Sequence, residues 1–122
     1  MKKCFKNLPF KTIQEILFKN PRYIFFRVSS SGSAITGDMK IELRPFQSIA
    51  MDPSIAPRGA PVFLIGHDKQ KTIPFNIAFV MDRGNAIKGH GRLDIYTGSG
   101  SQAEEIAMKF RSQGRIIFLI AK

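Results

Sequence analysis

Residues 47–65 read QSIAMDPSIAPRGAPVFLI and decide the fold class. Two short segments, at residues 47–51 and 62–65, are predicted as strands, and the second is wholly apolar with residue types that suit β-strands. An Asp-Pro pair at positions 52 and 53 ends the first run, and two further prolines around a glycine mark a turn before the second. The stretch therefore predicts two short strands joined by a turn, in a mainly β protein.

Four further runs with strand-like composition and two helical patterns extend this interpretation along the chain. The predicted strands occupy residues 23–28, 73–81, 92–96 and 115–121, and the predicted helices residues 12–20 and 101–112. The last run is almost wholly apolar, which predicts a central, buried strand. About six short strands with two short helices favour a compact β-barrel over a parallel α/β sheet.

Both predicted helices begin with the Ser/Thr-x-x-Glu spacing of a capping box, in which two side chains satisfy free N–H groups at the helix start. Thr12 with Glu15 and Ser101 with Glu104 have this spacing. Gly114 is the expected stop of the second helix.

Charge and cysteine content narrow the classes of partner. The chain has 19 Lys and Arg against 9 Asp and Glu, a net charge of +10. This charge favours binding to an anionic partner, such as nucleic acid, a membrane surface or an anionic cell wall, or else it serves solubility alone. One cysteine, Cys4, excludes an internal disulfide, and with two histidines no metal-ligand cluster or cofactor site is expected. No apolar run precedes Cys4, so we expect no signal peptide or lipoprotein signal in this chain, which is then not exported or is a piece of a longer protein.

Three aspartates stand in distinctive settings. Asp94 lies within a predicted strand, where carboxylates are disfavoured, and it either serves chemistry or pairs with Arg92 on a solvent-facing strand. Asp82 ends a predicted strand and either serves chemistry or bonds to the following turn. Asp52 precedes a proline, an ordinary way to open a turn. No Ser-His-Asp or Cys-His arrangement is recognisable.

The three aspartates lie in three blocks that resemble the three-aspartate (3D) domain. The blocks are residues 48–64, 81–89 and 92–100, in this order. Residues 20–27 resemble the run that precedes this domain in the membrane-bound lytic murein transglycosylase A family. The resemblance covers about residues 8–122. We expect a basic irregular N-terminus at residues 1–11 and the three-aspartate catalytic barrel domain at residues 12–122.

The resemblance implies a fold, a reaction and a location. The family's domain is a double-psi β-barrel. Its reaction is the non-hydrolytic cleavage of the β-1,4 bond between N-acetylmuramic acid and N-acetylglucosamine in peptidoglycan glycan strands, which leaves a 1,6-anhydro ring. The location is then periplasmic or associated with the outer membrane. A second domain forms the other wall of the substrate groove in the family, and this chain has no room for it, so a partner would supply that wall or the enzyme is truncated.

The resemblance also assigns roles to residues. Asp94 matches the catalytic acid and Asp82 its supporting aspartate. Asp52, Lys88, Gly89 and Tyr96 are expected to bind substrate. A catalytic acid must be protonated near neutral pH, which requires partial burial or a nearby negative charge, and Asp82 would supply that charge or orient Asp94.

Three residues depart from the family's pattern. Arg83 places a cation beside the supporting aspartate, Asn85 stands where glycine is usual and would need a glycine-like backbone, and Arg58 replaces an apolar residue. These departures leave a non-catalytic, glycan-binding barrel as the alternative. A basic nucleic-acid-binding module is the weaker alternative, because no recognition motif for RNA or DNA is present and no nucleic acid partner is expected.

Overall fold

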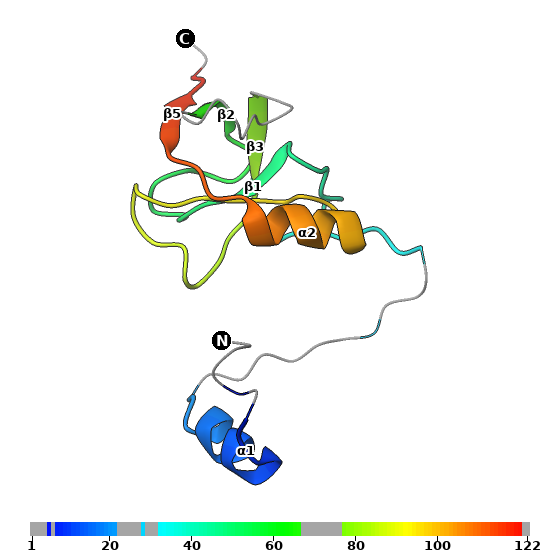
Figure 1. Ribbon diagram of the computed structural model, residues 1–122. Helices are drawn as coiled ribbons and strands as arrows, with labels where there is room; N and C mark the ends of the chain where they lie inside the picture. Colours follow the sequence, from blue (N-terminus) through cyan, green and yellow to red (C-terminus); the bar gives the residue numbers. More distant parts are fainter. Residues whose placement is uncertain (1–4, 6, 22–27, 29–31, 67–76, 121–122) are drawn as a thin grey trace. The chain divides into compact units, whose positions relative to one another are not determined.

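The computed structural model describes residues 5, 7–21, 28, 32–66 and 77–120. The chain forms two compact units, Met1–Ser33 and Ala34–Lys122. Helix α1 belongs to the first unit, and the strands and helix α2 belong to the second (Figure 1). Among the described residues, no helix has the length and apolar character needed to cross a membrane. The domain boundary predicted between residues 11 and 12 stays a prediction.

Helix α1 spans Phe10–Phe18, two residues earlier at each end than predicted. Its N-cap is Pro9, whose carbonyl accepts the N–H of Ile13, and no side chain caps the helix. The predicted capping box of Thr12 with Glu15 is therefore wrong, because Thr12 already lies inside the first turn. The predicted strand at residues 23–28 lies outside the described residues apart from Val28, which is exposed.

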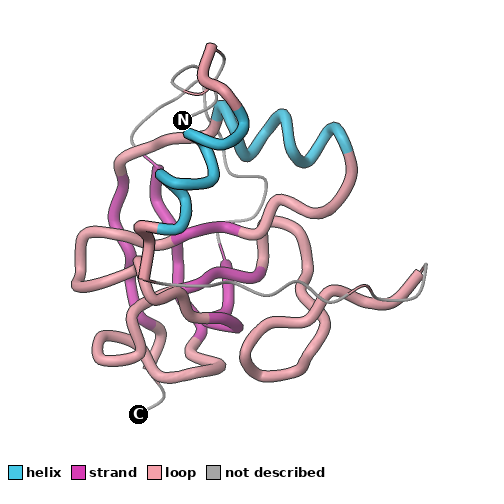
Figure 2. The backbone as a smooth tube through the Cα atoms, turned by 90° about the horizontal axis from the view of Figure 1, so that it is seen from below, coloured by secondary structure: helices cyan, strands magenta, loops and turns pink. Residues whose placement is uncertain are grey.

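The second unit is built on a five-stranded sheet with the order β4-β1-β3-β2-β5. The strands are β1 (Ser48–Ala50), β2 (Pro61–Gly66), β3 (Ile77–Asp82), β4 (Asp94–Ile95) and β5 (Gly114–Phe118). β1 and β3 pair in parallel, and the other neighbours are antiparallel. Figure 2 shows these strands gathered side by side, with long loops between them. The fold is mainly β with two helices, as predicted.

Alternating burial along β2 and β3 forms the core. In β2, Val62 and Leu64 are buried, and in β3, Ala78 and Val80 are buried, while their neighbours are more exposed. This period of two is what a sheet with one covered face requires. Ile49 and Met51 extend the same cluster at 1% exposure each, and Ala56 completes it.

Strand β5 corrects the prediction of a central, buried final strand. It lies at the edge of the described sheet and pairs with β2 alone. Only one of its faces reaches the core: Ile116 and Phe118 pack there, while Ile117 is 48% exposed. The apolar run 116–121 therefore shows the composition of a buried strand without its position. Gly114 begins β5 and therefore does not stop a helix. Packing explains the glycine here, because a Cβ at this position would lie 2.4 Å from the carbonyl oxygen of Ile65.

Helix α2 spans Ser101–Lys109 and ends three residues earlier than predicted. Its N-cap is Gly100, with φ of 88°, and no side chain caps the helix, so the predicted capping box of Ser101 with Glu104 is wrong. Ala103 alone is buried on this helix. On the exposed face, Lys109 forms an ion pair with Glu105 one turn earlier.

Candidate active site

Ala50 organises the predicted catalytic pair. On one side of β1 it pairs with Asp82 of β3, and on the other side with Asp94 of β4. Its neighbour Ile49 pairs with Val80 and Ile95 in the same way, and these side chains face the core. Cross-strand partners project from the same face of a sheet, so both aspartates share the face opposite the core.

A β-bulge makes this arrangement possible. The register of β1 against β3 runs Ile49 with Val80 and then Ala50 with Asp82, so Met81 is an extra residue. Without it, Asp82 would follow Val80 at a spacing of two and face the core. A one-residue slip moves a side chain to the other face, and bulges commonly re-aim a residue in this way. The two aspartates are thus two strand spacings apart, about 10 Å between their backbones.

A short hairpin at residues 35–43 holds Asp82. The N–H of Asp38 donates to Oδ1 of Asp82 at 3.0 Å. The hairpin closes through a Thr36–Glu42 bridge and packs tightly, since a Cβ on Gly37 would lie 2.6 Å from the carbonyl oxygen of Met81. Asp82 therefore has a neutral donor on its carboxylate, and its position depends on a loop 44 residues away in sequence.

The carboxylate of Asp38 forms ion pairs with Arg58 and Arg83, two of the residues that depart from the family's pattern. Nη2 of Arg58 lies 2.6 Å from its Oδ2, and Nε of Arg83 lies 3.1 Å from its Oδ1. Asp38 is 19% exposed, and the two arginine side chains are about half exposed. The guanidinium of Arg83 is thus paired with the carboxylate of Asp38. Sequence reasoning missed Asp38, although its turn between Ile35 and Ile41 is a recognisable hairpin pattern.

Asp52 is buried, at 6% exposure, and both of its oxygens are used. Oδ1 accepts the backbone N–H and the hydroxyl of Ser54, each at 3.0 Å, and Oδ2 accepts the N–H of Gly89 at 2.8 Å. The Gly89 bond, followed by the two from Ser54, lowers the pKa of Asp52 to about 2, with a small contribution from the charge of Lys88. Asp52 therefore fastens the loop at residues 84–91 to the end of β1.

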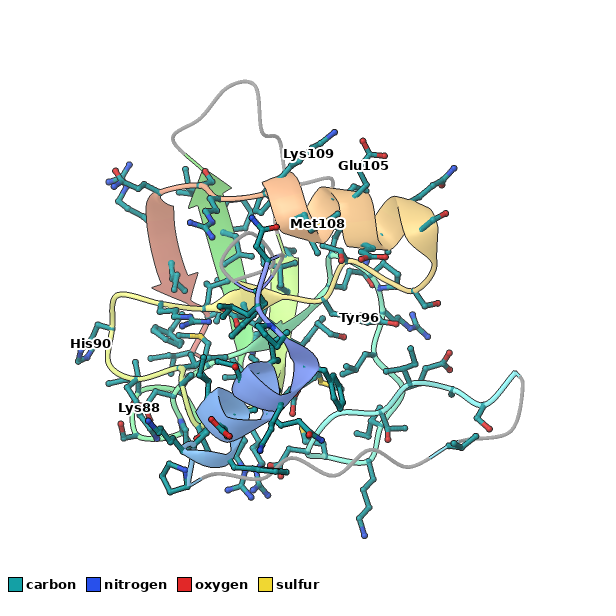
Figure 3. The ribbon with its side chains drawn as sticks, turned by 60° about the horizontal axis from the view of Figure 1, so that its bottom comes forward. Lys88, His90, Tyr96, Glu105, Met108 and Lys109 are labelled. Atoms are coloured by element: carbon teal, nitrogen blue, oxygen red, sulfur yellow. The ribbon has the colours of Figure 1, made fainter. Side chains whose placement is uncertain are left out.

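That loop presents basic side chains to solvent. Buried Ile87 anchors it, and Lys88 and His90 point outward (Figure 3). Asn85 does not take the positive φ that the family's glycine suggested: among the described residues, only Lys40 and Phe46 do so without being glycine. The expectation of a glycine-like backbone at Asn85 is therefore wrong.

Asp94 forms a two-bond ion pair with Arg92. Nε of Arg92 donates to Oδ1 and Nη2 donates to Oδ2, both at 3.0 Å. The side chains are 52% and 51% exposed, and Asp94 raises the pKa of Arg92, first by hydrogen bonding and then by its charge. The solvent-facing pair that the sequence offered as an alternative interpretation is present in the structure. Within the part of the chain that the structure describes, Asp94 is neither buried nor paired with another carboxylate.

An open groove of about 1060 Å³ contains Asp94. Residues from β4, the end of α2 and β5 line it, among them Thr97, Phe110 and Ile116. Its charged lining is basic apart from Asp94 and consists of His90, Arg92, Arg111 and Arg115. The groove can therefore receive an extended ligand that carries negative charge.

The other predicted site residues lie outside this lining. Asp82, Asp52, Lys88, Gly89 and Tyr96 are not among the residues that line the groove. Tyr96 is half-buried, and its backbone bonds to Ser48 and Phe46 on the side of β1 that carries β4. In the structure, Asp82 and Asp94 are linked through their shared strand partner Ala50. Asp52 is hydrogen-bonded directly to the N–H of Gly89.

Comparison with known proteins places this arrangement in a family. The family model described as the 3D domain matches residues 47–120, which contain all three aspartates and all the residues that line the groove. This chain belongs to the 3D domain family. The prediction of a three-aspartate domain is therefore confirmed.

Relatives of this 3D domain include lytic transglycosylases. The membrane-bound lytic murein transglycosylase A of Vibrio cholerae is 32% identical over 111 residues, which are 86% of this chain and 30% of that protein. The structure of lytic transglycosylase LtgG of Burkholderia pseudomallei is similar at 37% identity and a TM-score of 0.65, over 88% of this chain and 33% of that one. Escherichia coli MltA with bound chitohexaose is similar at 25% identity and a TM-score of 0.72, over 97% of this chain and 37% of that one. The chain thus spans about a third of these relatives.

Proposed function

We propose that this 3D domain is the catalytic part of a peptidoglycan lytic transglycosylase that acts at the periplasmic side of the outer membrane. The observation that carries the proposal is the placement of Asp94 in an open groove, with Asp82 on the same sheet face across Ala50. Relatives that carry this domain are named lytic transglycosylases. One of them binds chitohexaose, a β-1,4-linked sugar chain, in its crystal.

In the proposed reaction, one carboxyl group serves twice. Asp94 donates its proton to the glycosidic oxygen as the bond to C1 of the muramyl residue breaks. The C6 hydroxyl of the same residue bonds to C1, and its proton passes to the carboxylate of Asp94, which regenerates the acid. No water is consumed, so a second carboxylate to activate water, as in ordinary glycosidases, is not required.

The remaining site residues support this step. Asp82, held by the N–H of Asp38, lies on the same sheet face across Ala50 and supplies negative charge beside the acid. Asp52 holds the loop that carries Lys88 and Gly89, and we propose that these two residues and Tyr96 bind the glycan strand beside the groove. We also propose that the sheet is part of a double-psi β-barrel of about six strands, supported by the parallel pairing of β1 and β3 among antiparallel neighbours.

A second wall for the groove would come from outside this domain. The groove is open, and the relatives have about two thirds of their length beyond the part this chain matches. We propose that a further domain or a partner protein covers the glycan strand from the other side. This wall would add binding and leave the roles of Asp94 and Asp82 unchanged.

The test is incubation of the protein with peptidoglycan sacculi and mass spectrometry of the products. We expect 1,6-anhydro muropeptides with the native chain and none with Asp94→Asn, which should fold normally because Asp94 is 51% exposed. Products with a free reducing end would mean hydrolysis and would contradict the single-acid mechanism.

The second candidate function is glycan binding without turnover. The ion pair of Asp94 with Arg92 favours it, because the guanidinium occupies both oxygens of the carboxylate. Binding of glycan strands with no products of either kind would support this candidate over the lyase.

A further inference from the structure

The groove that contains Asp94 lies between the two edge strands of the described sheet. The sheet order is β4-β1-β3-β2-β5, so β4 with Asp94 and β5 with Arg115 are its opposite edges. Both residues line the groove, and no residue of β1 or β3 does so. The groove therefore bridges the edges of a curled sheet, and a ligand held at Asp94 has room to extend toward β5.

The lining of this groove has an apolar part and a basic part. The apolar part consists of side chains that belong to the core or pack against it: Leu64, Leu93, Ile95 and Ile116. The ionisable residues of the lining are exposed and, apart from Asp94, basic. Ligand sites commonly combine an apolar lining with a few polar groups that fix orientation. The combination here fits a ligand with small apolar groups and carboxylates.

The two ends of the groove differ in what satisfies their arginines. At the β4 end, Arg92 donates to both oxygens of Asp94. At the β5 end, Arg115 is exposed, and within the part of the chain that the structure describes it forms no ion pair. Its backbone is fixed by pairing with Ile65. An arginine that is held on a strand and has no acid of its own can present two parallel donors to a carboxylate.

We propose that the β5 end of the groove is a subsite for the peptide stem that peptidoglycan carries on its muramyl sugars. Arg115 binds a free carboxylate of the stem, while the sugar chain lies at Asp94. Arg111 lines the same end, in the connection that leads from α2 into β5 (Figure 1). The inference rests on the proposed function for the nature of the polymer, and it makes the stem part of what the domain recognises.

The chemistry and the length of the stem match this end of the groove. The stem is joined by an amide to the lactyl group of N-acetylmuramic acid, and it combines alanine methyl groups with free carboxylates. Around the sheet, β4 and β5 are four strand spacings apart, about 19 Å, and the path across the groove is shorter. An extended stem of four or five residues spans about 14–17 Å. A stem can therefore reach Arg115 from a muramyl sugar near Asp94.

A pair of glycines leaves the backbone accessible at this end of the groove. Gly66 and Gly114 are register partners in β2 and β5, both are exposed, and both line the groove. Glycine in a strand often marks a place where a ligand or another backbone approaches closely. Ser112 and Gln113 precede Gly114 in the same lining, so polar groups are available to the amides of a bound peptide.

The test is a binding cycle with the native chain and a disaccharide of N-acetylglucosamine and N-acetylmuramic acid that carries a tetrapeptide stem. This compound lacks the bond that the proposed reaction cleaves, so binding is measured without turnover. Calorimetry compares it with the same compound in which the stem carboxyls are amidated. We expect amidation to weaken binding to the native chain about tenfold, the effect of losing one hydrogen bond between charged groups.

Substitutions complete the cycle. Arg115→Gln should weaken binding of the carboxylate form about tenfold and leave binding of the amidated form unchanged, because the two changes remove the same interaction. Arg44→Gln is the matched control, since Arg44 is exposed, lies outside the groove lining and should change neither affinity. Thermal unfolding of both variants checks the fold. The subsite would be overturned if the carboxylate form failed to bind, if the native chain bound both forms equally, or if Arg115→Gln weakened both forms alike.

Product formation is measured separately, so the failures of the two proposals are distinguishable. With soluble glycan strands that carry stems, Arg115→Gln should raise KM about tenfold and keep kcat. With strands from which an amidase has removed the stems, it should change neither constant. Anhydro products without coupling in the binding cycle would retain the lyase and remove the subsite. Coupling without products from either kind of strand would retain the subsite and remove the lyase.

Discussion

Asp82 and Asp94 are both cross-strand partners of Ala50, from strands on opposite sides of β1. The small side chain of Ala50 therefore lies between the two carboxylates on one face of the sheet. In the proposed reaction, a larger side chain at this position would fill the space between the two carboxylates.

We expect Ala50→Val to lower the rate of anhydro-product formation by about 10- to 100-fold, the size of effect that small misplacements of substrate produce. Valine suits a strand, so the thermal unfolding temperature should change little. Ala50→Ser adds little volume and serves as the control. A fully active Ala50→Val variant would show that the space between the aspartates is not used.

The hydrogen bonds that Asp52 accepts predict that the free energy of unfolding depends on pH. Its pKa is lowered from 3.8 to about 2 in the folded protein, so folding favours the ionised form. The resulting contribution to stability is complete above pH 3.8 and is lost as the pH falls through about 2. Chemical unfolding between these limits should show this loss in the native chain.

Asp52→Asn removes the titrating group and with it this part of the pH dependence. The variant should be less stable than the native chain at neutral pH, because the N–H groups of Gly89 and Ser54 then face an uncharged acceptor. An unchanged slope in the acid range would mean that another carboxylate causes it.

Substitutions of Arg83 and Asp38 should lower activity to different extents. Arg83→Thr should keep activity within a few-fold of the native chain, because Arg83 already directs its charge to Asp38. Asp38→Ala should lower activity more, since both arginines are then free to pair with Asp82. Its cost in stability is about 1 kcal/mol for two partly exposed ion pairs. Anhydro-product rates of the two variants, with chemical unfolding of each, distinguish these effects.

Gly114 is required by packing. A Cβ would lie 2.4 Å from the carbonyl oxygen of Ile65, a backbone atom that cannot move away without breaking the β2–β5 pairing. We expect Gly114→Ala to lower the free energy of unfolding by about 1–3 kcal/mol. Gly91→Ala has no atom within 4 Å of the new Cβ and is the matched control for stability. Equal stabilities would show that the edge strand adjusts freely.

The sequence predicted the strands of residues 47–65 well because the Asp-Pro pair and the following prolines and glycine mark where they end and begin. Predicted runs at residues 47–51 and 62–65 correspond to β1 at Ser48–Ala50 and β2 at Pro61–Gly66. The position of β5 was predicted wrongly, since an apolar run does not reveal how many neighbours a strand has. The start of α2 at Ser101 was predicted correctly, whereas the start of α1 and both capping boxes were predicted wrongly, because neither helix has a side-chain cap at its N-cap residue, Pro9 or Gly100.

For the site, the sequence identified the three aspartates but could not reveal their surroundings. The bulge at Met81, which aims Asp82, depends on pairing with a strand about 30 residues earlier in the chain. The contact of Asp38 with Arg58 and Arg83 depends on three separate turns. Arg92 was recognised as a partner of Asp94 because the two residues lie two positions apart, on one side of an extended chain.

The Asp38 ion pairs have an evolutionary consequence. Arg58 and Arg83 place two cations beside Asp38, whose N–H donates to Asp82 and whose carboxylate pairs with both arginines. A lineage that acquires either arginine without an acid at position 38 would expose its supporting aspartate to a competing cation. The three positions should therefore change together among descendants of this domain, with the aspartate arriving first.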